Sequence, residues 1–353
     1  MIRMTHQPDD SATKPLADER GVALLICLLI MAILTVVVFQ FHYEVQVETA
    51  LVANSFEALE AEYAARSGVT FCLATLRMDA ENDVMLPAEA RTDNLTEEWM
   101  AGLEPMQVAR ATVAARISDE DGKLSINRAV DEKKPTDADE RAVGQLTQLF
   151  SELDILGDAD PVELTTLVCD WLDPDSVERD GGAESTYYES LPVPYRCKNG
   201  WLDSIEELAL VRGFSPEIIA GQRVVSESDF FSEEEMLPGL AEFLTVHGSR
   251  NGRINVNTAP EPVIRALFYE SPLVAESIIS QRAVAPFAGI KDLQQRVPQK
   301  LGTGVNVSFR SNHFAILSEG NVHGVRVSVE TVVRRVLTPQ GVRFDTVAWK
   351  VIR

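Results

Sequence analysis

The sequence has little cysteine and little positive charge, and each shortage excludes a class of protein. Its 353 residues include four cysteines, too few for a disulfide-rich scaffold. Its 32 lysines and arginines stand against 54 aspartates and glutamates, which gives a net charge of −22. Because phosphate binding depends on clustered Lys and Arg, nucleic acid is a poor partner. The hydrophobic content of 45% is enough to bury more than one core.

Motifs of catalysis are also missing. The five histidines are scattered, and neither H-E-x-x-H nor G-x-S-x-G occurs. Neither Cys169 nor Cys197 has a histidine close to it in the sequence. We therefore predict that the chain is not an enzyme. The alternative is a metal-dependent hydrolase at the acidic segment described below.

One uncharged run, VALLICLLIMAILTVVVF at residues 22–39, is long enough to span a membrane as a helix. It is longer than the core of a cleaved secretory signal, and no A-x-A follows it. Residues 44–79 then contain no proline, and their apolar side chains recur every three or four positions. The pattern predicts one helix from about Val22 to Arg77, roughly 85 Å long.

Strand-like patterns follow the predicted helix and return at the end of the chain. Residues 107–119 carry partly alternating β-branched side chains, and EDGK at 120–123 predicts a hairpin with the following LSIN. Alternation is found again at 313–320, 322–337 and 342–353. A long helix packed on such an antiparallel sheet is an α+β domain.

Helical patterns dominate between about residues 128 and 310, a segment the size of a domain. The predicted helices are residues 139–155, 160–173, 202–213 and 215–224. Two further stretches, 254–268 and 273–295, resemble helix-hairpin-helix modules, some of which bind DNA. The turn between them lacks G-x-G, so helical packing is favoured over DNA binding.

The segment CDWLDPDSVERDGGAESTYYESLPVPYRCKNGWLDSIEEL, residues 169–208, holds ten carboxylates and three basic side chains. Repulsion among them favours disorder unless a cation binds. Hard oxygen ligands suit Ca²⁺ far better than Zn²⁺, which prefers His and Cys. The spacing is not that of an EF-hand, because Val177 and Glu178 stand where that loop needs other residues. A solvated acidic loop without an ion is the alternative.

Cys169 and Cys197 flank this acidic segment. In an oxidising compartment a disulfide between them would close a loop of about thirty residues and stabilise the fold by ~3 kcal/mol. Two buried free thiols are the alternative.

The start of the chain resembles the amino-terminal segment of type IV pilins and type II secretion pseudopilins, with a polar leader, Gly21 and then the apolar run. The resemblance implies that the prepilin peptidase cuts between Gly21 and Val22 on the cytoplasmic side and that Val22 becomes a methylated terminus. Most relatives have Glu as the fifth mature residue, where it pairs with a neighbour's terminal amine. Ile26 stands there, which points toward a terminal subunit. A plain uncleaved anchor is the alternative.

Three further stretches make the resemblance more specific: ISDEDGKLSINRA (117–129), the acidic segment, and INVNTAP (254–260). Together they are similar to the K-type minor pseudopilins of the type II secretion system, the general secretion pathway protein K family. The resemblance implies an α+β fold in which a pilin-like long N-terminal helix packs on an antiparallel sheet, interrupted by a large, mostly α-helical inserted domain.

The implied organisation has five parts. They are a cleaved leader (1–21), a transmembrane helix (22–43), the first part of the pilin-like core (44–127), the inserted domain (128–310) and the last strands of the core (311–353).

The resemblance also implies a two-calcium site in the inserted domain, held by carboxylate or carbonyl oxygens. The ligands that we assign are Asp173, Asp175, Ala183 (through its carbonyl), Glu184, Asn199, Asp203 and Glu207. Asp170 is expected to cap a helix or face solvent, and Glu206 could replace Glu207.

The function that the resemblance implies is assembly. Such a protein caps the pseudopilus tip with the I- and J-type minor pseudopilins, starts assembly in the inner membrane with its C-terminal domain in the periplasm, and supports export of folded substrate proteins. A bulky inserted domain would clash with a copy stacked above it. The competing hypothesis is a membrane-anchored periplasmic helix-hairpin-helix module of the DNA-uptake type, which the pilin-type junction at Gly21 argues against.

Overall fold

The computed structural model describes residues 19–87, 91–131, 138–225, 234–249, 251–301, 306–338 and 341–353. Residues 1–18, most of the predicted leader, lie outside this part of the chain. The chain divides into two compact units, the first ending at Leu59 and the second running from Glu60 to Arg353. Each unit is described by itself.

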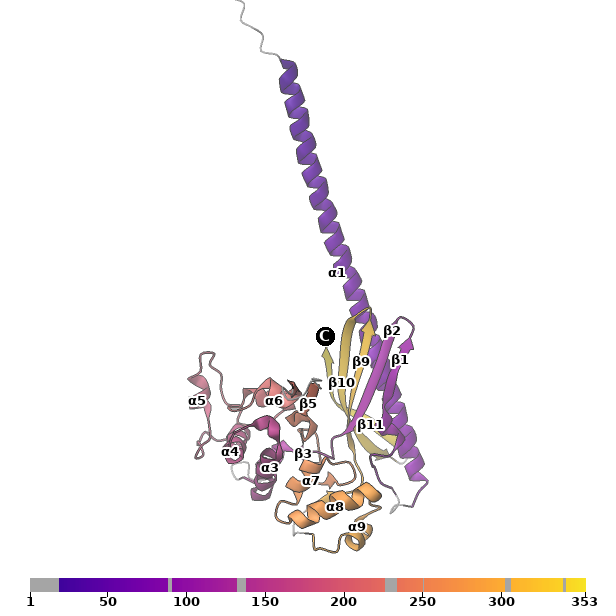
Figure 1. Cartoon of the computed structure of the whole chain (residues 1–353), viewed down its shortest axis with the longest axis vertical. Coiled ribbons are helices and arrows are strands. Elements are labelled where there is room, and N and C mark those ends of the chain that lie inside the picture. Colours follow the sequence, from indigo (N-terminus) through magenta and orange to yellow (C-terminus); the bar gives the residue numbers. More distant parts are fainter. Residues whose placement is uncertain are drawn as a thin grey trace, which may run out of the picture. The chain divides into compact units, whose positions relative to one another are not determined.

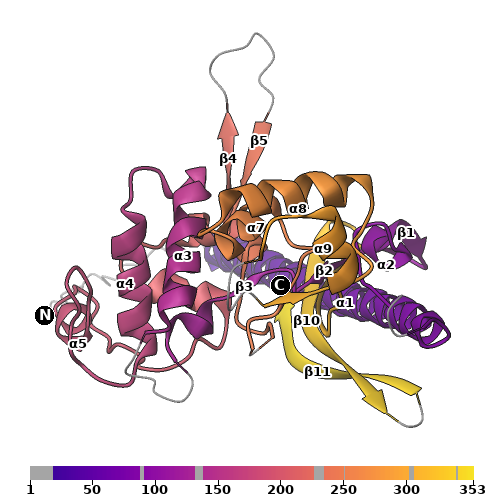
Figure 2. The same ribbon diagram turned by 90° about the horizontal axis from the view of Figure 1, so that it is seen from below.

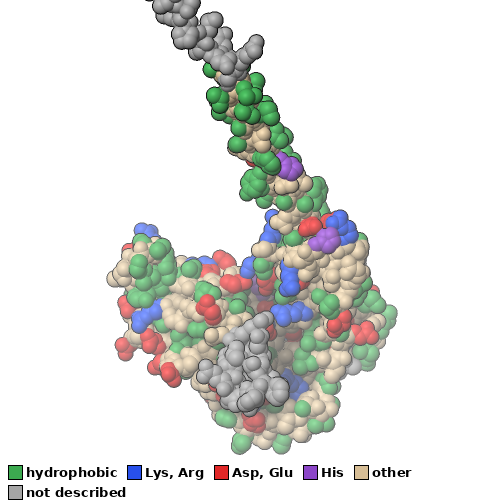
Figure 3. All heavy atoms as spheres, turned by 45° about the horizontal axis from the view of Figure 1, so that its top comes forward, with side chains coloured by type: hydrophobic (Ala, Val, Ile, Leu, Met, Phe, Trp, Pro, Cys, Tyr) green, Lys and Arg blue, Asp and Glu red, His purple; other side chains and the backbone are tan. Residues whose placement is uncertain are grey.

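The helix α1 runs without a break from Glu19 to Val84, which confirms the predicted long helix (Figure 1). In the first unit its large hydrophobic side chains from Val22 to Tyr43 are 50–71% exposed. Figure 3 shows mostly hydrophobic side chains, in green, on the surface of this part of the helix. The segment is long and apolar enough to cross a membrane, which fits a single-pass anchor.

In the second unit, one face of α1 is buried against a sheet. The buried positions recur every three or four residues: Ala61, Ala65, Val69, Cys72, Leu76 and Ala80. The four from Ala65 to Leu76 share a core with Trp99 of the short helix α2 (Glu98–Ala101) and with Phe314. The rings of Trp99 and Phe314 meet edge to face at 5.4 Å. The predicted amphipathic character of this part of the helix is confirmed.

The sheet has five antiparallel strands in the order β1-β2-β9-β10-β11. Their bounds are β1 (Leu103–Val108), β2 (Ala111–Asp119), β9 (His313–Val322), β10 (Val325–Thr338) and β11 (Gly341–Ile352). The three C-terminal strands confirm the sequence prediction. Because β2 and β9 are neighbours, everything between them is an insertion into the sheet.

The predicted hairpin after residue 119 is wrong. Strand β2 pairs with β1 and β9, whereas β3 (Leu124–Ser125) pairs in parallel with β6 (Leu244–Thr245). The turn residue Asp121 is bonded to the start of β9 instead. Its carboxylate accepts hydrogen bonds from the backbone amides of Asn312 and His313. These bonds direct the chain away from the sheet.

The inserted segment consists mainly of short helices packed around one hydrophobic core. Its helices are η2 (Ile126–Ala129), α3 (Glu140–Glu152), η3 (Asp154–Leu156), α4 (Pro161–Leu172), α5 (Ser185–Glu189), η4 (Ile205–Leu210), α6 (Pro216–Ala220), η5 (Leu240–Glu242), α7 (Glu261–Leu267), α8 (Pro272–Val284) and α9 (Ile290–Arg296). Its other strands are β4 (Gly221–Val225), β5 (Glu234–Pro238), β7 (Ile254–Asn255) and β8 (Val307–Ser308). Helix α3 packs against both α4 and α7 (Figure 2).

The helix predictions for this segment are confirmed in part. Residues 139–155 and 160–173 contain α3 and α4. Residues 202–213 contain the 3-10 helix η4 instead of an α-helix, and 215–224 contain the one-turn α6 followed by strand β4. The stretches that resemble helix-hairpin-helix modules form α7, α8 and α9, whose apolar faces belong to the core of the segment.

Asp119, at the end of β2, is buried where the sheet meets the inserted segment. Its Oδ2 accepts hydrogen bonds from Thr258 Oγ1 at 2.6 Å and from Ser311 Oγ, and its Oδ1 accepts one from the Asp121 amide at 2.8 Å. Burial, together with the nearby charge of Asp121, raises the pKa of Asp119 to about 7. One side chain thus joins three segments of the chain.

Gly320 of β9 marks a close approach between the sheet and α1. A Cβ atom at this position would clash with the backbone oxygen of Ala61 and lie 2.9 Å from the backbone nitrogen of Ala65. Backbone atoms of a packed helix cannot move aside as a flexible side chain would, so this position requires glycine.

We expect Gly320→Ala to lower the free energy of unfolding by about 1–3 kcal/mol, because it forces α1 off the sheet. Guanidinium titration of the full-length protein in detergent, followed by tryptophan fluorescence, measures this change. Gly200→Ala is the matched control, since the nearest atom to its Cβ would be 3.9 Å away. Equal stability of the two variants would contradict the packing described.

Candidate metal centre

Three buried carboxylates meet at the C-terminal end of α4. Asp170 lies in the last turn of the helix, Asp173 caps its end, and Glu184 caps the start of α5. Each side chain offers an oxygen within 4.8 Å of the others, and all three residues are at most 2% exposed. Gly182 makes room for them, because a Cβ there would clash with Asp170 Oδ2.

Among the described residues, one guanidinium faces this group of carboxylates. Arg179 Nη1 donates to Asp170 Oδ1 at 2.7 Å and also to Asp173 Oδ2, and the Arg179 backbone amide donates to Asp170 Oδ2 at 3.2 Å. Burial and the neighbouring charges of Asp173 and Asp170 raise the pKa of Glu184 to about 7. The site therefore has more negative charge than Arg179 offsets.

Two buried oxygen atoms in this region accept no hydrogen bond from the described residues. They are Glu184 Oε1 and Asn199 Oδ1. Asn199 has a φ of 50°, in the left-handed region, and its Nδ2 donates to the backbone oxygen of Asp175. Buried acceptors without donors are uncommon and call for a water or an ion. Carboxylate and amide oxygens are the ligands of a hard divalent cation, so the residues present fit such an ion.

The structure brings together some of the predicted ligands and separates others. Asp173 and Glu184 belong to the group of three, and Ala183 is fully buried beside them. Asp203 and Glu207 instead accept hydrogen bonds from Lys198 Nζ, at 2.8 and 2.7 Å, and do not join that group.

Two other side chains of the acidic segment have partners of their own. Asp175 Oδ1 accepts a hydrogen bond from the Val177 amide at 2.8 Å. Glu206, the alternative to Glu207, forms an ion pair with Lys350 of β11 at 2.5 Å. Glu206 thus contacts the sheet and is not one of the three clustered carboxylates.

The expectation that Asp170 caps a helix or faces solvent is wrong. Asp170 is fully buried and belongs to the group of three carboxylates. Its spacing from Asp173 could have revealed this, because residues three apart lie on one face of a helix. The many charged residues of the segment suggested exposure, whereas this face of α4 is buried.

The sequence left open whether Cys169 and Cys197 form a disulfide or remain free thiols. Cys169 and Cys197 are buried free thiols. Cys197 Sγ donates to the backbone oxygen of Asp170 at 3.6 Å, and Cys169 Sγ lies 4.0 Å from that of Ala129. Burial raises the pKa of Cys169 to about 11 and that of Cys197 to about 12, so both thiols stay protonated near neutral pH.

Aromatic side chains of the acidic segment pack against one another. The Tyr188 ring meets Trp171 edge to face at 5.1 Å and lies 5.3 Å from Tyr195. The Tyr195 hydroxyl donates to the backbone oxygen of Leu210 at 2.8 Å. Apolar packing therefore holds the carboxylates close in spite of their repulsion.

Comparison with known protein families shows which proteins this chain is similar to. Two family profiles described as type II secretion system (T2SS), protein K, match residues 122–223 and 254–314. The type II secretion system protein K of Pseudomonas aeruginosa is 26% identical over 321 residues, 90% of this chain and 89% of that protein. The chain belongs to the type II secretion system protein K family. It is a minor pseudopilin of type II secretion.

Other members of the protein K family agree. The protein K of Aeromonas hydrophila is 24% identical over 90% of this chain and 93% of its own length. A chain in the crystal structure of the GspK-GspI-GspJ complex from the enterotoxigenic Escherichia coli type 2 secretion system superposes with a TM-score of 0.60 at 17% identity. The superposition covers 85% of this chain and 98% of the other, and it confirms the predicted α+β fold.

Removing the Arg179 guanidinium should destabilise the protein, and added calcium should restore the lost stability. In EDTA, we expect Arg179→Gln to lower the free energy of unfolding by about 3 kcal/mol, because buried carboxylates lose their counter-charge. Millimolar calcium chloride should restore most of this loss, since an ion that binds only the folded state stabilises it. Denaturant titration with and without calcium measures both values.

The matched control is Arg196→Gln, which removes an arginine of the same segment whose side chain is 85% exposed and paired with Glu189. We expect its loss to stay below about 1 kcal/mol in either buffer. An Arg179→Gln loss that is identical with and without calcium would contradict a cation site here.

Proposed function

We propose that this minor pseudopilin sits at the tip of the pseudopilus, initiates its assembly and supports export of folded proteins across the outer membrane. The observation that carries the proposal is the insertion of a folded segment between the neighbouring strands β2 and β9. A lobe of this size beside the pilin-like sheet would collide with a copy stacked above it. The end of a fibre is the position where no copy follows.

The same proposal includes the partners. The solved complex named above joins GspK with GspI and GspJ, and we propose that I- and J-type minor pseudopilins bind this chain too. The contact surface would be the exposed apolar side chains of α1, including Val52 and Phe56, because apolar helix faces pack against one another.

We further propose that the prepilin peptidase removes residues 1–21 and that Val22 becomes the methylated amino terminus. Residues 22–43 would then cross the inner membrane, with the rest of the chain in the periplasm. Ile26, which is 51% exposed on α1, supports a terminal position, because it offers no charge to a neighbour's terminal amine.

We propose that the acidic segment binds calcium. The first ion would use Asp170, Asp173 and Glu184, together with Asn199 Oδ1, since these oxygens lie buried and two of them lack donors. Calcium would supply the positive charge that Arg179 supplies only in part. Bound in this way it would fix loops in place and perform no chemistry.

A second ion would be held by Asp175, Asp203 and Glu207, whereas the Ala183 carbonyl would be a further ligand of the first ion. Lys198 now provides the positive charge beside Asp203 and Glu207, and an ion there would take its place. The two proposed sites therefore share one pattern, a cationic side chain standing next to carboxylates that a calcium ion could bridge.

Calcium binding can be measured directly. We expect EDTA-treated full-length protein to take up calcium in a calorimetric titration and to bind magnesium more weakly, because Mg²⁺ demands stricter geometry. Asp173→Asn combined with Glu184→Gln should abolish the tighter event. Asp203→Asn should remove only the second, and the exposed Asp158→Asn neither. Absence of calcium uptake, or uptake unchanged in the double variant, would refute the proposal.

Partner binding has its own test. Full-length protein produced in membranes with tagged I- and J-type pseudopilins should be captured as a ternary complex. Val52→Glu with Phe56→Glu should reduce capture at least tenfold, since charges would enter an apolar helix contact. Glu48→Gln, on an exposed turn of the same helix, should leave capture unchanged.

The intact mass of the captured chain reports its amino terminus, which we expect at methylated Val22. A chain that begins at Met1, or one that forms no complex with either partner, would overturn the pseudopilus-tip proposal. Calcium binding would be unaffected by either result.

A further inference from the structure

A cavity lies away from the acidic segment, at the start of β9 and the end of β10. Its volume is about 490 Å³. The lining includes four arginines and a histidine against one carboxylate: Arg253, Arg310, Arg334, Arg335, His313 and Asp121. In a chain with a net charge of −22, this concentration of positive charge is exceptional.

The one carboxylate among the described lining residues already has its partners. Asp121 Oδ2 accepts the Asn312 amide at 2.7 Å, and Oδ1 lies 3.0 Å from His313 Nδ1. Arg335 is held by Asp93, with Nη1 2.9 Å from Oδ1 and Nη2 2.5 Å from Oδ2. Arg310 and Arg334 have longer ion pairs than Arg335 does.

Three arginine nitrogens behind the wall of this cavity have no hydrogen-bond acceptor among the described residues. Arg310 Nε and Nη2 and Arg335 Nε are buried without a hydrogen bond. The nearest carboxylate to Arg310 is that of Asp83, at 3.4 Å, and Arg334 has Asp345 at 3.8 Å. Burial, with the charge of Arg335, lowers the pKa of Arg310. The charges of Arg310 and Arg334 are therefore only loosely compensated, and an anion in the cavity would offset them.

We propose that this cavity, the arginine pocket, binds an oxyanion between Arg310 and Arg334. A guanidinium presents its donors in a fork that matches carboxylate and phosphate geometry. The oxyanion is either the carboxylate of an acidic peptide segment or free inorganic phosphate, since both offer the same acceptor oxygens.

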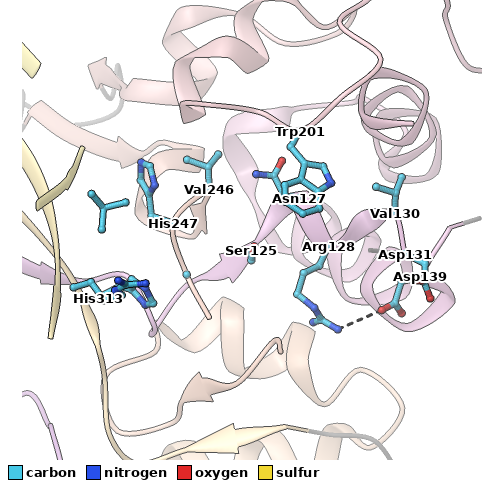
Figure 4. Close-up of a pocket in the computed structure, with 13 residues that line it drawn as sticks. Ser125, Asn127, Arg128, Val130, Asp131, Asp139, Trp201, Val246, His247 and His313 are labelled. Atoms are coloured by element: carbon cyan, nitrogen blue, oxygen red, sulfur yellow. Dashed lines mark hydrogen bonds and ion pairs between the residues drawn. The ribbon is translucent and has the colours of Figure 1, made fainter. Parts of the chain in front are cut away.

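A neighbouring cavity gives the pocket room for more than a small ion. It has a volume of about 500 Å³ and shares His313 and Arg334 with the arginine pocket. Figure 4 shows Trp201 and Val246 along it, and Arg128 directed at Asp139, so that the charge of Arg128 is already paired. A peptide with its carboxylates in the arginine pocket could extend along these apolar side chains.

The test is a calorimetric titration of the full-length protein in detergent at low salt. One arm uses sodium phosphate, and the other uses a tetra-aspartate peptide with blocked ends. We expect Arg334→Gln to weaken binding at least tenfold, because a charge-assisted hydrogen bond is lost. Raising the ionic strength to 0.5 M should weaken binding in the wild type as well.

Arg326→Gln is the matched control. It removes an arginine of the same strand, β10, that has an equally loose ion pair, 3.8 Å from Glu319, and does not line the pocket. Arg310→Gln is a second variant, with its fold checked by near-ultraviolet circular dichroism. We expect Arg326→Gln to bind like the wild type and Arg310→Gln to bind at least tenfold more weakly.

The outcomes are distinct. Binding of phosphate alone identifies a free anion as the ligand, and binding of the peptide with competition by phosphate identifies an acidic segment. No binding in either arm, or an equal loss in the Arg334 and Arg326 variants, would overturn the proposal.

Discussion

The buried Asp119 carboxylate is the constraint on which the folded unit depends. It bonds the end of β2 to Thr258 in the inserted segment and to Ser311, just before β9. Asn255 extends the network, because its Nδ2 donates to Ser311 Oγ at 2.8 Å and to the backbone oxygen of Asp93 at 3.0 Å. In a low-dielectric interior such a satisfied network is strong and specific. It fixes where the chain leaves the sheet and where it returns.

The protein compensates its acidic side chains in two different ways. Besides the group at α4, three carboxylates lie within reach of one another in the core: Asp79, Asp93 and Glu97. There Asp93 has a bidentate partner in Arg335, and burial raises the pKa of Glu97 to about 8, which favours its neutral form. In that group, protonation of Glu97 and the ion pair of Asp93 with Arg335 compensate the negative charge. At α4 the partly exposed Arg179 forms ion pairs with Asp170 and Asp173, and Glu184 Oε1 has no donor among the described residues, so that group supports a cation proposal and the group around Asp93 does not.

Local patterns predicted the parts of the fold that depend on nearby residues. The long helix and the three C-terminal strands follow from periodicity. Helices α4 and α6 each start at a proline, after the N-caps Asp160 and Ser215. The hairpin prediction failed because the pairing of β2 is decided by β9, far along the chain. At the site, Asp173 and Glu184 were predictable as acids beside turns. The ion pair between Asp203 and Lys198 could not be predicted, since pairing among exposed side chains depends on the final backbone conformation. The arginine pocket had no sequence signal, because its members are scattered between Arg253 and Arg335.

The pairing of β2 with β9 also constrains the order of folding. Thr112 lies opposite Asn321 and Asp119 opposite Phe314, so every rung of this ladder joins positions about two hundred residues apart. Closing such a loop in an unfolded chain is slow and entropically expensive. If the inserted segment folds first, its two ends come together before the rungs form, and the loop that remains is short. The inserted segment would then act as an internal template that lets the sheet close.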